Sequence, residues 1–233
     1  REYYDKHFPY ETICAYADKP LEPTDVESES LRRREFALEK TENRSNGANG
    51  APAGTIMRRH ISCSGPDELW KAVSDMKADK VHVGAVFCKP PCKKAQARAL
   101  MRVAAASSAR AADGTGSATA TAARARAAAA AAEAESIKPV FRELVYEIDV
   151  DDYNDVQRVN KNNQEECDAA FPLAAVGMRV VEHILRRHFG FKKFLCVYSG
   201  RRGASLTVCD ERAGVLDNAA RKAVLSFLQP GYA

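Results

Sequence analysis

The chain has 233 residues, of which 45% are hydrophobic and 28% charged, and its formal net charge is +4. This balance is typical of a globular protein with an apolar core, and the length allows one large domain or two small ones. No apolar run approaches the roughly 18–20 residues that cross a bilayer, so we expect no membrane partner. Because the chain begins with Arg1 rather than Met, we expect a fragment of a longer protein.

Basic residues occur in pairs along the chain, among them Arg58-Arg59 and Arg201-Arg202. Such pairs are usual on a solvated surface, and they are also what a phosphate-rich partner requires. Arg58 and Arg59 therefore fit either a charged strand face or the path of a nucleic-acid strand. The seven cysteines, an odd number, are typical of reduced thiols rather than of a disulfide framework.

The first half of the chain alternates short helical and extended patterns. Residues 1–17 are predicted to be helical with a break near Pro9, and a second helix is predicted over Glu68–Met76. Pro66 and Asp67 suit the first turn of that second helix. Strands are predicted over residues 34–38, 55–62 and 81–87, with a loose hairpin tip at 41–54.

Residues 104–136 are dominated by Ala, with Ser, Thr, Gly and a few Arg. Helix propensity is high in part of this segment. The segment has no large apolar face to bury, however, so an isolated helix there is marginal in water. We therefore predict a low-complexity loop insertion that is disordered and carries no chemistry.

The second half combines strands and amphipathic helices. Leu173, Val176 and Val180 recur at helical spacing, and Gly190 stands where that helix is expected to stop. Strands are predicted over 141–149, 194–198 and 204–210, with a tight turn at 199–203 and Asp217 as the N-cap of the last helix. Because strands and helices mix without a regular βαβ repeat, the predicted class is α+β with a largely antiparallel sheet.

Residues 146–153, "YEIDVDDY", place carboxylates at every second position. Glu147 and Asp149 therefore project from one face of a strand, and Asp151 continues the row if the strand persists that far. Clustered carboxylates repel one another without a cation, and divalent metals prefer oxygen ligands. The pattern fits either a pair that holds metal ions for phosphoryl transfer or an acidic, water-facing strand.

The turn "SGRRG" at 199–203 separates two apolar strands. Its backbone N–H groups, the guanidinium groups of Arg201 and Arg202, and the hydroxyl of Ser199 all suit phosphate oxygens. An ordinary hairpin with a charged tip explains the same residues. Together with the acidic strand, the turn supplies metal ligands and phosphate ligands, which are the minimum set for a nucleotidyl transferase.

Five stretches in order resemble the catalytic small subunit of archaeal and eukaryotic DNA primase, closer to the eukaryotic branch. These are "REFAL" (34–38), "VGAVF" (83–87), "ELVYEIDVDDYNDV" (143–156), "FGFKKFLCVYSGRRG" (189–203) and "VCDE" (208–211). The resemblance implies an α+β fold with a mixed, largely antiparallel catalytic sheet flanked by helices. It divides the chain into an N-terminal part of the catalytic domain (1–103), the Ala-rich insertion (104–136), and the part with the acidic strand and the SGRRG turn (137–233).

The resemblance also implies an activity and a site. The family makes short RNA primers on single-stranded DNA during replication, using ribonucleoside triphosphates and two Mg²⁺ or Mn²⁺ ions. Expected partners are the primase large subunit and DNA polymerase alpha, and the expected localisation is nuclear. Glu147 and Asp149 match the catalytic metal strand, with Asp151 as a further metal ligand. The expected nucleotide-binding residues are Arg34, His82, Ser199, Arg201, Arg202 and Ser205.

Several positions depart from the family pattern. Glu147 replaces an aspartate, and its added methylene moves the carboxylate by about 1.5 Å, a shift that can cost about 10²-fold in rate. Ser205 stands where the family has a histidine, and His82 where it has an aspartate near the ribose. Only Cys167 remains at the family's zinc site, so we expect no structural zinc, and we expect the third metal aspartate to lie beyond Ala233. The alternative function is a catalytically impaired primase-like subunit that acts as a binding or scaffold component of a primase complex.

Overall fold

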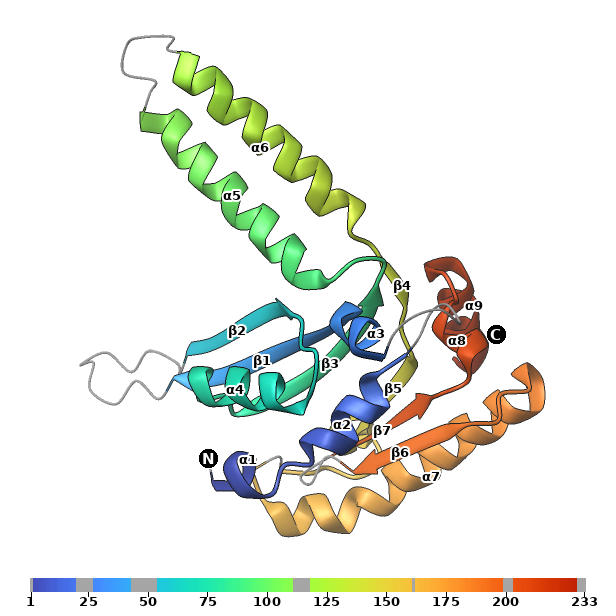
Figure 1. The fold of residues 1–233 in the computed structure, drawn as a ribbon. Coiled ribbons are helices and arrows are strands. Elements are labelled where there is room, and N and C mark those ends of the chain that lie inside the picture. The colour runs from blue at the N-terminus through green and yellow to red at the C-terminus, as the bar shows by residue number, and fades with distance from the viewer. Residues whose placement is uncertain are drawn as a thin grey trace. The chain divides into compact units, whose positions relative to one another are not determined.

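The computed structural model describes residues 2–19, 27–42, 54–110, 118–160, 162–198 and 203–229. It divides the chain into two compact units, Arg1–Val140 and Phe141–Ala233, which we call the first and second units (Figure 1). Each unit contains strands paired in an antiparallel sheet together with helices, which confirms the predicted α+β class.

The sheet of the first unit has four strands in the order β2-β1-β3-β4. Its strands are β1 (Arg34–Glu42), β2 (Gly54–Ile61), β3 (Lys80–Phe87) and β4 (Pro139–Phe141). The central strand β1 pairs antiparallel with both β2 and β3, and its register shifts near Phe36 in both pairings. The three predicted strands are thereby confirmed, although β1 extends beyond Leu38, and the predicted hairpin tip lies mostly outside the described residues.

Helices bury one face of this sheet. They are α1 (Glu2–Lys6), α2 (Tyr10–Ala17), α3 (Glu27–Arg33) and α4 (Pro66–Met76). Phe36 and Leu38 of β1 are fully buried against Leu69 and Val73 of α4 and Cys14 of α2. Since side chains alternate along a strand, Glu35 is directed to the face away from this core.

The Ala-rich segment forms most of a helical hairpin rather than the disordered loop predicted for it. Helix α5 (Pro91–Arg110) and helix α6 (Ala118–Ser136) run side by side (Figure 1), whereas residues 111–117 lie outside the described residues. Ala97 of α5 is buried with Ala130 and Ala134 of α6. Small side chains let the helices approach closely, and this mutual packing supplies the stability that an isolated helix lacks.

The second unit has a three-stranded antiparallel sheet in the order β5-β7-β6. Its elements are β5 (Leu144–Asp149), the 3₁₀ helix η1 (Val150–Tyr153), α7 (Gln164–Phe189), β6 (Phe194–Tyr198), β7 (Gly203–Val208), α8 (Glu211–Gly214) and α9 (Asn218–Leu228). Leu144, Leu206 and Val208 pack with Met178 and Leu185 of α7 on one face. The predicted strand 141–149 is divided between β4 and β5, because residues 142–143 do not pair in either sheet.

Helix ends in this unit follow the sequence signals. Gly190 ends α7 with a left-handed φ of 66°, and Asp217 caps α9 by accepting a 2.7 Å hydrogen bond from the N–H of Ala220. The side chain of Asn163 caps the other end of α7 by accepting the N–H of Glu165. Among the described helices, none is both long enough and apolar enough to cross a membrane.

Candidate functional site

The acidic strand lies on the face of β5 that is turned away from the core. Glu147 is opposite Ser205 of β7, and Asp149 is opposite Gly203. Because directly opposite residues of an antiparallel pair share a face, Glu147 and Ser205 are side-chain neighbours. Glu147 is exposed and Asp149 is half-buried. The predicted pair of carboxylates therefore shares one open face of the second unit.

Asp149 is held at the end of β5 by two reciprocal hydrogen bonds with Asp152. Its N–H donates a 3.0 Å hydrogen bond to Oδ2 of Asp152, and its carboxylate accepts the N–H of Asp152 in return. A Cβ at residue 203 would lie 2.5 Å from Oδ1 of Asp149 and 2.8 Å from the carbonyl oxygen of Ile148. Glycine at position 203, the last residue of the SGRRG motif, thus lets β7 approach this carboxylate closely.

Asp151 does not continue the row, because β5 ends at Asp149 and the chain turns into η1. Val150 is buried with Cys167 and Ala174 of α7, which directs the chain towards that helix. Asp151 would share the face of Glu147 and Asp149 only if the strand continued to residue 151, and it does not. Its role as a metal ligand stays a prediction.

Three of the expected phosphate ligands lie outside the described residues: Ser199, Arg201 and Arg202. Their proposed roles stay predictions. The fourth residue of that region, Ser205, is half-buried on β7 between Glu147 of β5 and Val197 of β6. Its hydroxyl is thus available beside the acidic strand.

Arg34 and His82 belong to the first unit. Arg34 is fully buried, and its guanidinium donates 2.8 Å hydrogen bonds to the carbonyl oxygens of Ala17 and Gly84. His82 is exposed on β3, with Nε2 3.3 Å from Oε2 of Glu39. Glu39 also accepts a 2.7 Å hydrogen bond from Lys80, which is the main reason that its pKa is lowered. The hydrogen bonds of Arg34 link α2 to β3. The nucleotide-binding roles of Arg34 and His82 stay predictions.

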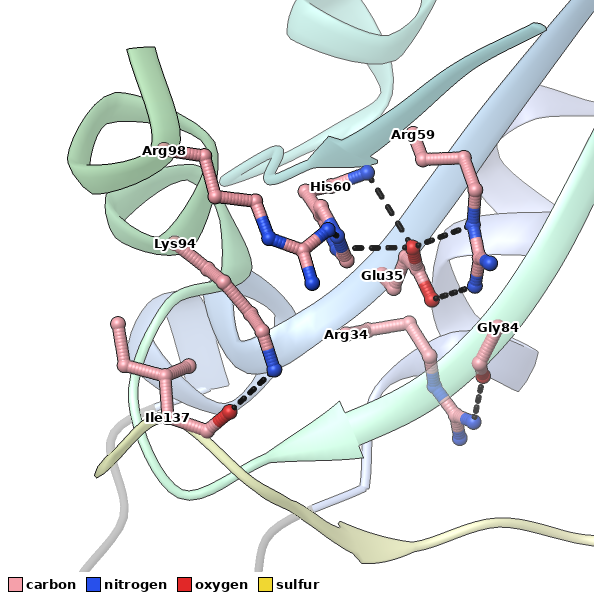
Figure 2. A network of polar contacts seen from close by, with 8 residues as sticks. All are labelled: Arg34, Glu35, Arg59, His60, Gly84, Lys94, Arg98 and Ile137. Atoms are coloured by element: carbon pink, nitrogen blue, oxygen red, sulfur yellow. Dashed lines mark hydrogen bonds and ion pairs between the residues drawn. The ribbon is translucent and has the colours of Figure 1, made fainter. Parts of the chain in front are cut away.

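A buried carboxylate that the sequence analysis did not single out lies beside Arg34. The side chain of Glu35 is 4% exposed, and its two oxygens accept hydrogen bonds of 3.3 and 3.2 Å from the guanidinium of Arg59 (Figure 2). The N–H of His60 donates a further 3.2 Å bond to Oε1. Gly84 makes room for this group, because a Cβ there would lie 2.8 Å from Oε2. Glu35 is therefore buried among charged and polar partners, on the face of the sheet opposite to α4.

Cations from α5 surround the ring of His60. Nη1 of Arg98 lies 3.2 Å from Nε2, and Nδ1 lies 3.0 Å from Glu35 at an angle unsuited to a hydrogen bond (Figure 2). Burial lowers the pKa of His60, and Arg98, Arg59 and Lys94 lower it further, whereas Glu35 opposes them. The ring is consequently neutral near pH 7, and this cluster has more positive than negative charge.

The described part of the chain contains no ready-made cluster of metal-binding side chains. No group of three or more His, Cys, Asp or Glu side chains there has an arrangement that suits a metal ion. All seven cysteines are free thiols, and Cys167 is buried on α7. The expectation that the family's zinc is missing stays a prediction.

A known protein family matches the part of the chain that carries the acidic residues of β5 and the strand β7. Residues 147–231 match the family model described as DNA primase small subunit. The chain is 40% identical over 94 residues to the DNA primase small subunit of Schizosaccharomyces pombe, which covers 40% of this chain and 20% of that protein. It is 24% identical over 226 residues to the subunit of Saccharomyces cerevisiae, which covers 97% of this chain and 42% of that protein. The resemblance to DNA primase small subunits is confirmed.

The DNA primase small subunit of Drosophila melanogaster is 38% identical over 93 residues, covering 40% of this chain and 21% of that protein. The chain therefore spans less than half the length of these curated relatives. The match to the primase family model begins at Glu147 and extends through β6, β7 and α9. It thus contains Glu147 and Asp149 of the acidic strand, the SGRRG motif and Ser205.

Proposed function

We propose that this chain carries the nucleotidyl-transfer site of a DNA primase small subunit. It would join ribonucleotides on a single-stranded DNA template and so make short RNA primers for DNA replication. The observation that carries the proposal is the pairing of β5 with β7. This pairing sets Glu147 and Asp149 opposite Ser205 and Gly203 within the residues that match the primase family.

The donor set of β5 suits the two Mg²⁺ or Mn²⁺ ions of the proposal. Glu147 and Asp149 offer carboxylate oxygens, which hard divalent cations prefer. The exposed position of Glu147 leaves room for a hydrated ion. Bound ions would supply charge neutralisation for the triphosphate and its leaving group. In the proposal, Glu147 and Asp149 hold these ions, with Asp151 as a further candidate ligand.

The remaining predicted residues would bind the nucleotide. Ser199, Arg201 and Arg202 would hold the triphosphate, and the hydroxyl of Ser205 would donate to a phosphate oxygen beside Glu147. Arg34 and His82 are the candidate nucleotide-binding residues of the first unit. By similarity to named primase subunits, the partners would be a primase large subunit and DNA polymerase alpha, and the complex would act in the nucleus.

A catalytically impaired primase-like subunit is the second candidate. It is favoured by two side chains on the shared face, because Glu147 and Ser205 replace the aspartate and histidine that the resemblance implies. Such a subunit would bind its partners and would not show metal-dependent nucleotide binding.

Nucleotide binding with and without Mn²⁺ separates the two candidates. We expect the full chain to bind a ribonucleoside triphosphate in the presence of Mn²⁺ and to extend a dinucleotide on single-stranded DNA. Asp149→Asn removes the charge and keeps the shape, so it should abolish extension and weaken Mn²⁺-dependent binding at least about tenfold.

Asp155→Asn is the matched control, since Asp155 is exposed and lies shortly after β5. This variant should keep wild-type binding and extension. Extension that survives Asp149→Asn would contradict the metal role of the strand. If the wild-type chain binds no nucleotide with Mn²⁺, the scaffold function would replace the catalytic one.

A further inference from the structure

Helix α5 concentrates positive charge along one line. Lys94, Arg98 and Arg102 are four residues apart, so they stand one above another on the same helix face over about 12 Å. The helix has no acidic residue in its sequence. Lys93 and Lys94 even occupy the first turn, where the helix dipole disfavours cations. Helix stability therefore does not account for this arrangement.

The same line of charge begins at the sheet of the first unit. Lys94 donates a 2.8 Å hydrogen bond to the carbonyl oxygen of Ile137 and lies over the ring of Phe87. Arg98 lies against His60 of β2, which adjoins Arg59 (Figure 2). These contacts orient Lys94 and Arg98, so the charges of these two side chains are held in place against the sheet.

The charge balance of this cluster is positive. Glu35 supplies one negative charge, whereas Arg59, Lys94 and Arg98 supply three positive charges around His60. The side chain of Arg59 remains 60% exposed although it pairs with Glu35. Arg102 is exposed one turn further along α5, and no ion pair to it occurs in the described part of the chain. The cluster around His60 thus has a net charge of about +2, and Arg102 adds an exposed positive charge beside it on the same helix face.

Helix α6 provides an internal contrast. It carries Arg124 and Arg126, both exposed, and its sequence also contains Glu133 and Glu135, so its cations and anions are equal in number. The two helices of the hairpin have nearly the same length and are both rich in Ala, yet only α5 carries an unbalanced line of cations. The positive charge therefore belongs to a particular face and not to the hairpin as a whole.

We propose that this cationic stripe, formed by Arg98 and Arg102 of α5 with Arg59 of β2, binds the phosphate backbone of single-stranded DNA. Guanidinium groups form paired hydrogen bonds with phosphate oxygens, and such contacts position a strand without reading its sequence. The inference rests on the proposed function, which supplies single-stranded DNA as the polyanion. It assigns to the base of the hairpin, between α5 and β2, a role in holding the template.

The test measures binding of a labelled single-stranded DNA to the full chain over a range of salt concentrations. Each phosphate contact contributes about 0.7 to the slope of log affinity against log salt for a single strand. Arg98→Ala combined with Arg102→Ala should therefore lower that slope by about 1.4 and weaken binding roughly tenfold at low salt. The single change Arg102→Glu should weaken binding in the same direction without removing a contact to His60.

Arg124→Ala combined with Arg126→Ala is the matched control, because it removes the same charge from α6. It should bind within about twofold of the wild type. Circular dichroism should show the same helix content for all variants. Wild-type affinity and slope in both the double α5 variant and Arg102→Glu would overturn the proposal, and so would an equal loss in the α6 control.

Two further readouts separate this proposal from others. A labelled poly-glutamate peptide tests for an acidic protein partner: loss of peptide binding in the α5 variant, with DNA binding unchanged, would overturn the proposal. Mn²⁺-dependent nucleotide binding tests the proposed function, and the α5 double variant should retain it. If the wild-type chain lacks nucleotide binding but its DNA binding falls with the α5 changes, the catalytic proposal fails and this inference stands.

Discussion

The two units each present a carboxylate on the open side of a sheet, but the surroundings of these groups differ. Glu35 of the first unit is buried, and it accepts hydrogen bonds from Nε and Nη2 of Arg59 and from the backbone N–H of His60. Glu147 of the second unit is exposed, and no basic side chain pairs with it among the described residues. Glu35 is thus paired with a cation of its own unit, whereas Glu147 has no such pairing within the described part of the chain.

This difference indicates which carboxylate serves the fold. Burying an ionised carboxylate is costly unless it is paired and hydrogen-bonded, so the cations around Glu35 are a requirement of its burial. An exposed carboxylate has no such requirement. Among the described residues, no basic side chain makes Glu147 part of a structural ion pair, which agrees with the proposed metal role of β5.

Removing Glu35 is expected to produce the largest effect on stability. Glu35→Ala leaves a cavity, deprives the N–H of His60 of its acceptor and leaves Arg59, Arg98 and Lys94 without a counter-charge. Arg59 can turn towards water because its side chain is 60% exposed, so we expect a loss of about 2–3 kcal/mol in the free energy of unfolding. Chemical denaturation of the wild type and the variant measures this loss.

Glu147→Ala is the paired experiment in the second unit. Because Glu147 is exposed, we expect its replacement to change the free energy of unfolding by less than about 0.5 kcal/mol. Mn²⁺-dependent nucleotide binding should nevertheless be lost. Equal destabilisation by the two replacements would remove the distinction between a structural and a functional carboxylate.

Adding one methyl group at Gly203 is expected to have the next largest effect. In Gly203→Ala the Cβ would press on Oδ1 of Asp149 and on the carbonyl oxygen of Ile148, at 2.5 and 2.8 Å. Because both contacts are with groups fixed at the end of β5, we expect a loss of about 1–2 kcal/mol in the free energy of unfolding. Displacement of the Asp149 carboxylate should also weaken Mn²⁺-dependent nucleotide binding.

Gly65→Ala is the control for that substitution. A Cβ at Gly65 would meet no atom within 4 Å, and the backbone there is extended, with a φ of −179°. Gly65 precedes α4, so the change costs only the small preference for Gly over Ala at an N-cap. A Gly203→Ala variant as stable as Gly65→Ala would show that β7 can move away from Asp149.

Much of the fold could be predicted from local signals in the sequence. Strand alternation, Gly190 and Asp217 correctly located strands and helix ends because each signal acts within a few residues. The Ala-rich segment was predicted wrongly to lack structure, because its stability comes from Ala97 packing against Ala130 and Ala134, more than 30 residues away. A pairing at that distance leaves no pattern within either helix.

The geometry of the acidic strand could be predicted only in part. Period-two alternation correctly placed Glu147 and Asp149 on one face, but it did not show that β5 ends at Asp149. The environment of Glu35 was missed because it depends on Arg59 and Gly84, which are 24 and 49 residues away, and on a register shift in β1. A charged residue next to a buried Phe in a predicted strand was the only local signal.

Titration of His60 is expected to change stability less than Glu35→Ala or Gly203→Ala does, and it tests the surroundings of His60 directly. Burial and the nearby guanidinium groups lower the pKa of His60 in the folded protein below its ordinary value of about 6.5. Between the folded pKa and about 6.5, the unfolded chain therefore binds more protons than the folded chain. The free energy of unfolding should consequently be lower at pH 5.5 than at pH 7.5.

His60→Asn removes the titrating group and suits the backbone there, since Asn tolerates the left-handed conformation that His60 adopts at φ 62°. This variant should show a smaller difference between pH 7.5 and pH 5.5 than the wild type. His183→Asn, on an exposed face of α7, should retain the wild-type difference. A wild-type protein that becomes more stable at pH 5.5, with His60→Asn removing that gain, would mean that Glu35 outweighs burial and the surrounding cations in setting the pKa of His60.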